Sequence, residues 1–313
     1  MDGLTAPFPA QRAPAKQRLA PQRTLKAAIG CVGVGVHSGR RVSLTLRPAD
    51  AGTGVMFRRT DLGLDLPARF DRVIDTRLCT VLGLPGEPTA RLGTVEHLMA
   101  AFAGCGVDNV VAEIDGPELP IVDGSAAPLV FLIDCAGTVE QDAPRREIEI
   151  LRTVRVAEGE AFAELRPGGP GFRMAMSIDF RAAAIGQQAL ALRLTPDSFR
   201  HEIADSRTFT DAADIEHLRK AGLARGGSLA NAVVVDAARV LNPGGLRRPD
   251  EFVRHKLLDA VGDLALAGAP LRGRFVAHRS GHTLNNRLLR ALFADASAWR
   301  FAGDAAPALS AAA

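Results

Sequence analysis

The sequence predicts an α+β fold made of two similar domains, in each of which helices lie on a sheet. Segments typical of strands and helices follow one another in a similar order in the two halves of the chain. A strand-like segment at residues 43–48 is also echoed at residues 162–167, since both end in Leu-Arg-Pro. With 313 residues, 47% of them hydrophobic, the chain is long enough to form two cores. We therefore expect one domain at residues 22–142 and a second at residues 143–302.

Alternating and β-branched segments predict the strands, and longer runs with apolar residues every three or four positions predict the helices. In the first half the expected strands are residues 41–48, 54–59 and 110–115, and the expected helices are residues 95–103 and 125–136. In the second half the expected strands are residues 147–156, 161–167, 173–180 and 273–278, and the expected helices are residues 214–221, 252–267 and 284–293. A site is expected where the two helical layers meet.

The glycine-rich segment at residues 33–39 invites comparison with dinucleotide-binding loops. It is followed by a strand-like segment instead of the helix that would face a pyrophosphate, so we interpret it as a tight turn between strands. His37 in this turn is still able to reach a ligand.

Composition restricts the partners and the compartment. A net charge of +3 is small for this length, and basic clusters are not interleaved with aromatic residues, so nucleic acid is not an expected partner. The four cysteines form no Cys-x-x-Cys pair, which favours a reducing cytoplasm. No apolar run approaches the ~18 residues of a membrane span, so we expect at most peripheral membrane contact. Residues 1–21, which are rich in proline, are expected to be a disordered extension, and residues 303–313 a loose tail.

The helix expected at residues 252–267 carries the first residues suited to chemistry. A period of 3.6 residues sets His255 and Asp259 one turn apart on one face, which is a spacing typical of metal ligands. Asp263 lies on the same face but ~12 Å from His255 along the axis, too far to share a metal with it. The alternative for such a helix taken alone is a solvated polar face opposite an apolar stripe.

A second segment strengthens the metal interpretation. Glu96 and His97 lie side by side at the start of an apolar, helix-forming run, so His97 is a candidate third ligand and Glu96 a candidate base. A catalytic zinc takes three nitrogen or oxygen ligands from the protein and keeps one position for water. The set of His97, His255 and Asp259 would meet that requirement, with Glu96 beside the water.

The familiar zinc peptidase motifs do not fit this segment. Ala101 stands where the His-Glu-x-x-His spacing needs its second histidine, and Gly93 stands where the inverted motif needs one. These spacings leave open an unrelated zinc amidase whose ligands come from distant parts of the chain.

Further motifs follow one another over nearly the whole chain. They lie at residues 22–26, 33–39, 94–98, 121–128, 206–209, 250–263 and 280–286. In this order they resemble the UDP-3-O-acyl-N-acetylglucosamine deacetylases of Gram-negative bacteria, the LpxC family, which carry out the committed step of lipid A synthesis. The resemblance implies two α/β-sandwich domains, each with a small insert, and a zinc site in the cleft between them.

The resemblance also implies a role for each residue of the site. The residues similar to the zinc ligands are His97, His255 and Asp259. The residues similar to the catalytic groups are Glu96 as general base, His282 as the cation that stabilises the oxyanion and protonates the leaving amine, Asp263 as the carboxylate that holds His282, Thr208 as the hydroxyl that polarises the carbonyl, and Lys256 as a cation near the reaction centre. The residues similar to substrate contacts are Phe209, Asp179, Phe180 and Lys256, and Asp123 resembles the carboxylate behind the first histidine ligand.

The implied reaction is hydrolysis of the N-acetyl group of UDP-3-O-(3-hydroxyacyl)-N-acetylglucosamine, which gives acetate and the free amine. Residue chemistry agrees with it, because zinc would activate water, Glu96 would accept its proton, and Asp263 would raise the pKa of His282. The ligand set also suits Fe²⁺. We expect a monomer that acts in the cytoplasm.

Two departures from the family pattern concern the substrate cleft. Residues 210–213 replace a common Gly-Phe pair at its rim, and small side chains at residues 181–186 stand where the second insert should build an acyl passage. Acyl length is therefore left open, and residues 182–194 are expected to form an exposed apolar mouth.

The same three ligands leave two other functions open. One is a zinc amidase for a different small amide, against which Phe180, Phe209 and Lys256 argue, because a nucleotide needs a stacking face and a phosphate-binding cation. The other is a non-catalytic protein with a structural metal, against which Glu96 argues, since a structural zinc needs no base.

Overall fold

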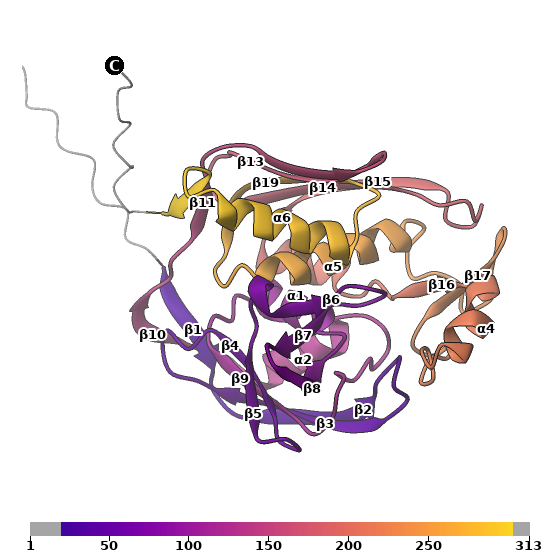
Figure 1. The fold of residues 1–313 in the computed structure, drawn as a ribbon, viewed down its shortest axis with the longest axis horizontal. Helices are drawn as coiled ribbons and strands as arrows, with labels where there is room; N and C mark the ends of the chain where they lie inside the picture. Colours follow the sequence, from indigo (N-terminus) through magenta and orange to yellow (C-terminus); the bar gives the residue numbers. More distant parts are fainter. Residues whose placement is uncertain (1–19, 303–313) are drawn as a thin grey trace, which may run out of the picture.

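The computed structural model describes residues 20–302, which form two α/β units that face each other through their helices (Figure 1). Figure 1 shows the sheet of the first unit along the bottom and the sheet of the second along the top, with helices of both units between them. The order of layers is therefore sheet, helix, helix, sheet. This arrangement buries one face of each sheet and places the helices of the two units against each other.

The first unit is built on a five-stranded sheet in the order β2-β3-β9-β4-β5. Its strands are β2 (Ile29–Val34), β3 (Arg41–Pro48), β4 (Val55–Arg59), β5 (Leu64–Pro67) and β9 (Val110–Ile114), and its helices are α1 (Glu96–Cys105) and α2 (Ala127–Ala136). In β3, the apolar residues Val42, Leu44 and Leu46 are buried, while their polar neighbours face outwards. This alternation is typical of a sheet that is covered on one face.

The second unit is built on a seven-stranded sheet. Its strands are β11 (Ile148–Ile150), β12 (Val154–Glu158), β13 (Ala161–Arg166), β14 (Phe172–Asp179), β15 (Gln187–Leu194), β19 (Leu271–His278) and β20 (Trp299–Phe301), and its helices are α5 (Glu251–Ala265) and α6 (His282–Ala294). Five of these strands lie in the order β12-β13-β19-β14-β15, with β11 and β20 added beyond β19.

The two units share one topology. In the first sheet, β3 is antiparallel to β2 and β9, while β4 is parallel to β9 and antiparallel to β5. In the second sheet, β13, β19, β14, β12 and β15 repeat these relations one for one. The echo between residues 43–48 and 162–167 therefore falls on corresponding strands, and the predicted fold class is confirmed.

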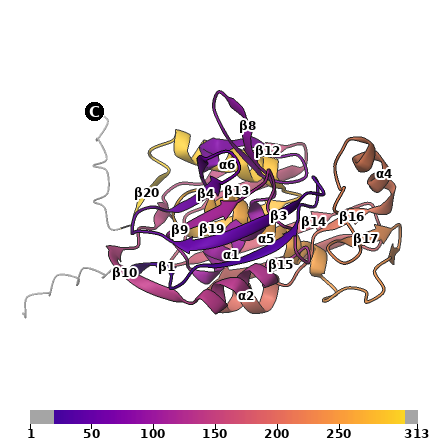
Figure 2. The ribbon, with the colours of Figure 1, turned by 90° about the horizontal axis from the view of Figure 1, so that it is seen from below.

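Each unit carries a small three-stranded insert, which lies between β5 and α1 in the first unit and between β15 and α5 in the second. The first insert consists of β6 (Val73–Asp75), β7 (Val81–Leu84) and β8 (Glu87–Leu92). The second consists of β16 (Phe209–Asp211), β17 (Val233–Asp236), β18 (Arg239–Val240) and helix α4 (Ala212–Lys220). Figures 1 and 2 both show the second insert at one end of the molecule, and Figure 2 shows β8 projecting from one side.

The remaining elements connect these parts. They are β1 (Pro21–Leu25), which pairs with β10 (Thr138–Pro144), and the short helices η1 (Phe70–Arg72), α3 (Pro196–Ser198) and η2 (Phe199–Ile203). The expected break after residue 142 falls inside β10, so we propose that the first domain passes into the second within this strand pair. Residues 1–19 of the predicted extension lie outside the described residues, and so do residues 303–313, the predicted tail. Within residues 20–302, no helix combines the length and apolarity needed to cross a membrane.

Two predictions about the second unit are wrong. The strand expected at residues 147–156 is two strands, because the amides of Leu151 and Arg152 turn to the carbonyl of Ala298 and leave the ladder. Residues 187–194 form β15 of the main sheet, not part of the second insert. Alternating apolar residues in this segment are typical of a strand in a main sheet, so it does not form the apolar opening expected on the second insert.

A glycine allows the two units to approach closely where α5 meets α1. A Cβ atom at Gly262 of α5 would lie 1.9 Å from the carbonyl oxygen of Glu96 in α1. No side chain fits at this distance, so α5 reaches the backbone of α1 only because position 262 is glycine. This contact brings the polar face of α5 to the first turn of α1.

Candidate active site

The three predicted metal ligands meet where α1 and α5 face each other. The Oδ1 atom of Asp259 lies 3.6 Å from Nε2 of His97 and 3.3 Å from Nε2 of His255. All three side chains are buried, and their ligand atoms lie within 4.8 Å of one another. The first unit thus gives one predicted ligand and the second unit gives two.

The chemistry of these donors fits a divalent cation. Among the described residues, Oδ1 of Asp259 is buried without a hydrogen-bond partner, whereas its Oδ2 accepts a hydrogen bond of 2.9 Å from Nζ of Lys256. Nδ1 of His255 lies 3.0 Å from the carbonyl oxygen of Ser206, to which it donates, so Nε2 keeps its lone pair. Burial lowers the pKa of His255 to about 4 and keeps it neutral. A buried carboxylate oxygen between two imidazole nitrogens, without a hydrogen bond to either in the described residues, is the arrangement that a metal would complete.

Glu96 stands beside this group at the first residue of α1. Its Oε2 accepts a hydrogen bond of 3.0 Å from the backbone amide of Thr80. Burial raises the pKa of Glu96, against the opposing influence of His282 and His97. A buried carboxylate of raised pKa, one residue from a metal ligand, is suited to accept and return a proton.

His282 and Asp263 form a second buried pair beside the predicted ligands. Nδ1 of His282 lies 2.9 Å from Oδ2 of Asp263, which leaves Nε2 for the cavity. Burial opposes the charge of the imidazole, but the charge and hydrogen bond of Asp263 outweigh it and raise the pKa of His282 to about 9. Asp263 lies too far along α5 to share a metal with His255. It instead keeps His282 protonated at neutral pH.

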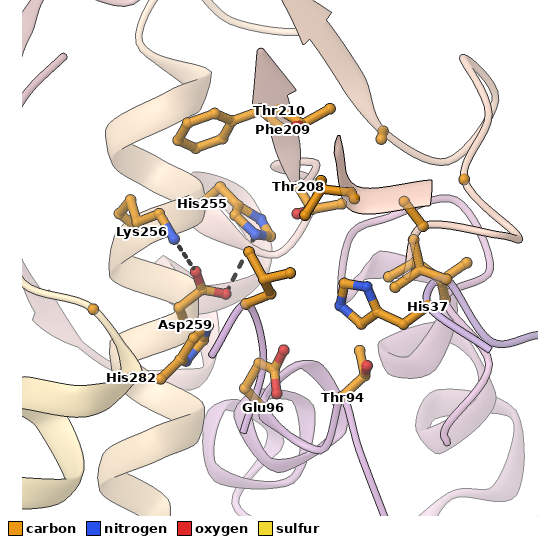
Figure 3. Close-up of a pocket in the computed structure, with 18 of the residues that line it drawn as sticks. His37, Thr94, Glu96, Thr208, Phe209, Thr210, His255, Lys256, Asp259 and His282 are labelled. Carbon is orange, nitrogen blue, oxygen red and sulfur yellow. Dashed lines mark hydrogen bonds and ion pairs between the residues drawn. The ribbon is translucent and has the colours of Figure 1, made fainter. Parts of the chain in front are cut away.

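These groups open into one cavity of about 780 Å³, drawn in Figure 3. The predicted site residues in its wall are Glu96, His97, Thr208, Phe209, His255, Lys256, Asp259 and His282. Figure 3 shows Thr208 and Phe209 across the cavity from Glu96 and His282. The site therefore draws on both units and on the start of the second insert.

One wall of the cavity is apolar and comes from the second insert. Its apolar side chains include Ile215, Leu218, Leu229, Val234 and Leu241. Two residues of the altered rim, Thr210 and Ala212, also lie in the wall. Among the described residues, the segment 181–194 does not line this cavity, so its expected role in an acyl passage is wrong. The passage was assigned to the wrong segment because the insert starts only at residue 209.

Asp179 and Phe180 lie outside the wall of this cavity. The ring of Phe180 packs edge-to-face on Phe209, with centroids 5.4 Å apart, and Phe180 is 38% exposed. Asp179 accepts a hydrogen bond from Gln187. Their contact with a substrate stays a prediction.

The expected place of Asp123 needs correction. Its Oδ1 accepts hydrogen bonds from the amide and hydroxyl of Ser125, and its Oδ2 accepts one of 2.9 Å from Arg247. Within residues 20–302 it has no hydrogen bond to His97. The carboxylate instead ties the loop before α2 to the second unit, because Arg247 lies there.

Backbone strain gathers around the cavity. Among its lining residues, positive φ angles occur at the non-glycine residues Leu78 (67°), Thr94 (58°), Ala224 (50°) and Arg279 (51°). Such conformations cost of order 1–3 kcal/mol each and are typical of functional sites. The pattern cannot be read from the sequence, because none of these residue types marks a left-handed turn.

Two further polar residues belong to the site, and sequence reasoning missed the second of them, Thr80. His37 lines the cavity, as the turn at residues 33–39 allowed, and its Nδ1 is buried without a partner. Thr80 bonds to both Glu96 and Asp263. No signal in the sequence distinguishes Thr80, since a lone threonine beside a strand is ordinary.

Comparison with known proteins identifies the family of this chain. The family model LpxC, UDP-3-O-acyl N-acetylglycosamine deacetylase, matches residues 22–294. The chain is 52% identical over 294 residues to the UDP-3-O-acyl-N-acetylglucosamine deacetylase of Phenylobacterium zucineum, a match that covers 92% of this chain and 99% of that protein. It is 51% identical over 284 residues to the protein of the same name from Idiomarina loihiensis, covering 90% of this chain and 92% of that one. The chain therefore belongs to the LpxC family of UDP-3-O-acyl-N-acetylglucosamine deacetylases.

Proposed function

We propose that this chain is a metal-dependent amide hydrolase that removes the N-acetyl group of UDP-3-O-(3-hydroxyacyl)-N-acetylglucosamine. The products are acetate and the free amine, and the reaction is the committed step of lipid A synthesis. The observation that carries the proposal is the unpaired carboxylate oxygen of Asp259 between two imidazole nitrogens, beside a buried glutamate. Relatives with the deacetylase name match this chain at about half of all positions.

The ion that His97, His255 and Asp259 would hold is proposed to be Zn²⁺, with Fe²⁺ as the other candidate that suits two imidazoles and a carboxylate. When bound, such an ion supplies Lewis acidity, which lowers the pKa of water at the site towards ~7 and polarises the amide carbonyl. Three protein ligands leave a position open for these oxygens, which favours a catalytic over a structural metal.

The side chains around the ligands supply the proton transfers. Glu96 accepts the proton of the attacking water, for which its raised pKa and its place beside His97 suit it. The hydroxyl of Thr208 and the protonated His282 donate hydrogen bonds to the developing oxyanion. His282 then gives a proton to the leaving amine, while Asp263 keeps its ring in place.

Lys256 is proposed to serve both the ligand set and the substrate. Its Nζ bonds to Oδ2 of Asp259, and this orients the carboxylate so that Oδ1 faces the two imidazoles. The nitrogen also lies 5.6 Å from the ring centre of Phe209 in the cavity wall. We infer that it adds positive charge for the phosphates or the oxyanion, with Phe209 and its neighbour Phe180 as contacts for the sugar and nucleotide.

The apolar wall of the second insert is proposed to hold the acyl chain. Its leucine, isoleucine and valine side chains give the cavity a lining that suits hydrocarbon and not a small polar amide. This wall disfavours the alternative of an amidase for another small substrate. We further propose that the protein acts as a monomer in the cytoplasm and meets its lipid-like substrate with at most peripheral membrane contact.

The test is amine release from the acylated UDP-sugar by purified protein. Activity should disappear on chelation and return with one equivalent of Zn²⁺ or Fe²⁺. The acyl chain should be varied in length and also omitted. Folded, metal-loaded protein that releases no amine from any of these substrates would refute the proposed reaction.

A further inference from the structure

One buried threonine of the first insert bonds to the proposed base, Glu96, and to Asp263, which holds the proposed acid, His282. Thr80 is 1% exposed and precedes β7. Its amide donates to Oε2 of Glu96 at 3.0 Å, and its hydroxyl donates to Oδ1 of Asp263 at 2.6 Å. Its carbonyl accepts a hydrogen bond from Val95, the residue before Glu96. Every polar group of Thr80 is therefore bound to the machinery of the site.

The carboxylate of Asp263 shows why this hydroxyl matters. Its Oδ2 is shared by Nδ1 of His282 and Nδ2 of Asn285, at 2.9 and 2.8 Å. Asn285 is itself held by Ser280, whose hydroxyl donates to its Oδ1. Within residues 20–302, the only side-chain donor to Oδ1 of Asp263 is Thr80. Without it, the buried oxygen would lose its partner and the carboxylate would be free to rotate.

We propose that Thr80 is a positioning residue, which sets the orientation of His282 through Asp263 and the orientation of Glu96 through its amide. The inference rests on the proposed function, because it assigns the base to Glu96 and the acid to His282. Thr80 does not line the cavity, so it acts on the reaction through these side chains and not on the substrate. Proton transfer is sensitive to such placement, since a displacement of ~1 Å can cost ~100-fold in rate.

This role also gives the first insert a function in the reaction. The insert is a separate small sheet. Through Thr80 it makes hydrogen bonds to the buried side chains of Glu96 and Asp263. Leu78, two residues earlier, has a φ of 67°, a strained conformation that the fold retains beside the cavity. The hydrogen bond from Thr80 to Asp263 joins the first unit to α5 of the second, across 183 positions of the chain.

The experiment compares Thr80→Val with Thr80→Ser. Valine has nearly the same shape and keeps the backbone amide, so it removes only the hydroxyl bond to Asp263. We expect kcat to fall about 10- to 100-fold in Thr80→Val with KM within about twofold of the wild type, and Thr80→Ser to stay within about threefold in kcat. Thr24→Val is the matched control, since Thr24 is also buried and its hydroxyl bonds to Asn109 and Ala49, far from the cavity wall.

A double-mutant cycle tests the route of the effect. In a His282→Ala background, Thr80→Val should change kcat by less than about twofold, because the group that it positions is gone. Wild-type kcat in Thr80→Val, a loss in Thr80→Ser as large as in Thr80→Val, or a full additional loss in the His282→Ala background would each overturn the inference. If Thr80→Val does not fold, Thr80→Ala enters the same cycle.

Failure of this inference can be told apart from failure of the proposed function. A wild-type protein without deacetylase activity refutes the function, whatever the variants do. The Nδ1–H proton of His282, observed by NMR and identified by its loss in His282→Ala, reports on the contact without any turnover. Its resonance should move in Thr80→Val and return in Thr80→Ser, and an unchanged resonance in Thr80→Val would contradict the proposed positioning.

Discussion

The two units share a topology but contribute different things to the site. Helices α1 and α5 occupy corresponding places, yet α1 carries the proposed base and one proposed metal ligand in its first turn, whereas α5 carries two proposed ligands and Asp263 over about two turns. The inserts differ more strongly. The first places a buried polar residue, Thr80, against Glu96 and Asp263, and the second forms an apolar wall of the cavity. A repeated scaffold thus supplies the interface between the units, and the inserts, which diverge, are proposed to position catalytic groups on one side and to bind the acyl chain on the other.

The largest expected effect comes from removing a ligand of the second unit. His255→Ala should lose the metal and lower kcat/KM by more than ~10³-fold, because several kcal/mol of transition-state stabilisation leave with the ion. Metal content per protein chain and turnover measure the two effects. A variant that retains stoichiometric metal and wild-type turnover would show that α5 does not provide the ligands.

Removing the base of the first unit should separate chemistry from metal binding. Glu96→Gln is expected to keep the metal and lose several hundredfold in kcat, the scale of a positioned general base. The matched control is His255→Ala, which should lose both. If Glu96→Gln keeps full kcat, the division of roles between α1 and α5 is wrong.

The His282–Asp263 pair predicts the pH dependence. The pKa of His282 is raised to about 9, so the ring stays protonated at neutral pH and loses its proton as the pH rises through that value. Activity that needs the charged ring should therefore fall on the alkaline side, at pH 9 or somewhat below when a cation is bound nearby. Asp263→Asn should move this alkaline limb to lower pH by more than one unit and lower kcat about 100-fold. An unshifted pH profile in Asp263→Asn would contradict the role of Asp263.

The contact between the units can be tested at one glycine. Gly262→Ala should push α5 away from the carbonyl of Glu96, with a loss of about 1–3 kcal/mol in the free energy of unfolding and about 10- to 50-fold in kcat. Gly244→Ala is the control, because no heavy atom within 4 Å meets its added Cβ. Denaturant unfolding and turnover of both variants measure the difference. Equal stability and activity in the two would show that close packing of α1 on α5 does not set the site.

The smallest expected effect concerns the second insert. Leu218→Ala should raise KM about tenfold for substrates with long acyl chains, the scale of a leucine side chain removed from an apolar contact, and leave kcat nearly unchanged. A substrate without the acyl chain should be processed equally by wild type and variant. An equal effect on both substrates would mean that this wall does not bind the acyl chain.

Much of the site can be predicted from the sequence, because the spacing of residues within one helix fixes their relative positions. One helical turn joins His255 to Asp259, and adjacency joins Glu96 to His97, so each pair keeps its geometry in any helix. The hydrogen bond of Thr80 to Asp263 and the turn of Asp123 towards Arg247 depend instead on how the two units pack. The repeated order of strands was predictable, because local alternation indicates each strand. The break in the strand at residues 147–156 was not, since it depends on the distant carbonyl of Ala298.

The most direct test of a shared site between the two units is anomalous diffraction at the zinc edge from crystals of the metal-loaded protein. We predict one ion bonded to Nε2 of His97, Nε2 of His255 and Oδ1 of Asp259, at about 2.0–2.2 Å from each. An ion held by residues of only one unit, or no ordered ion between α1 and α5, would contradict this account.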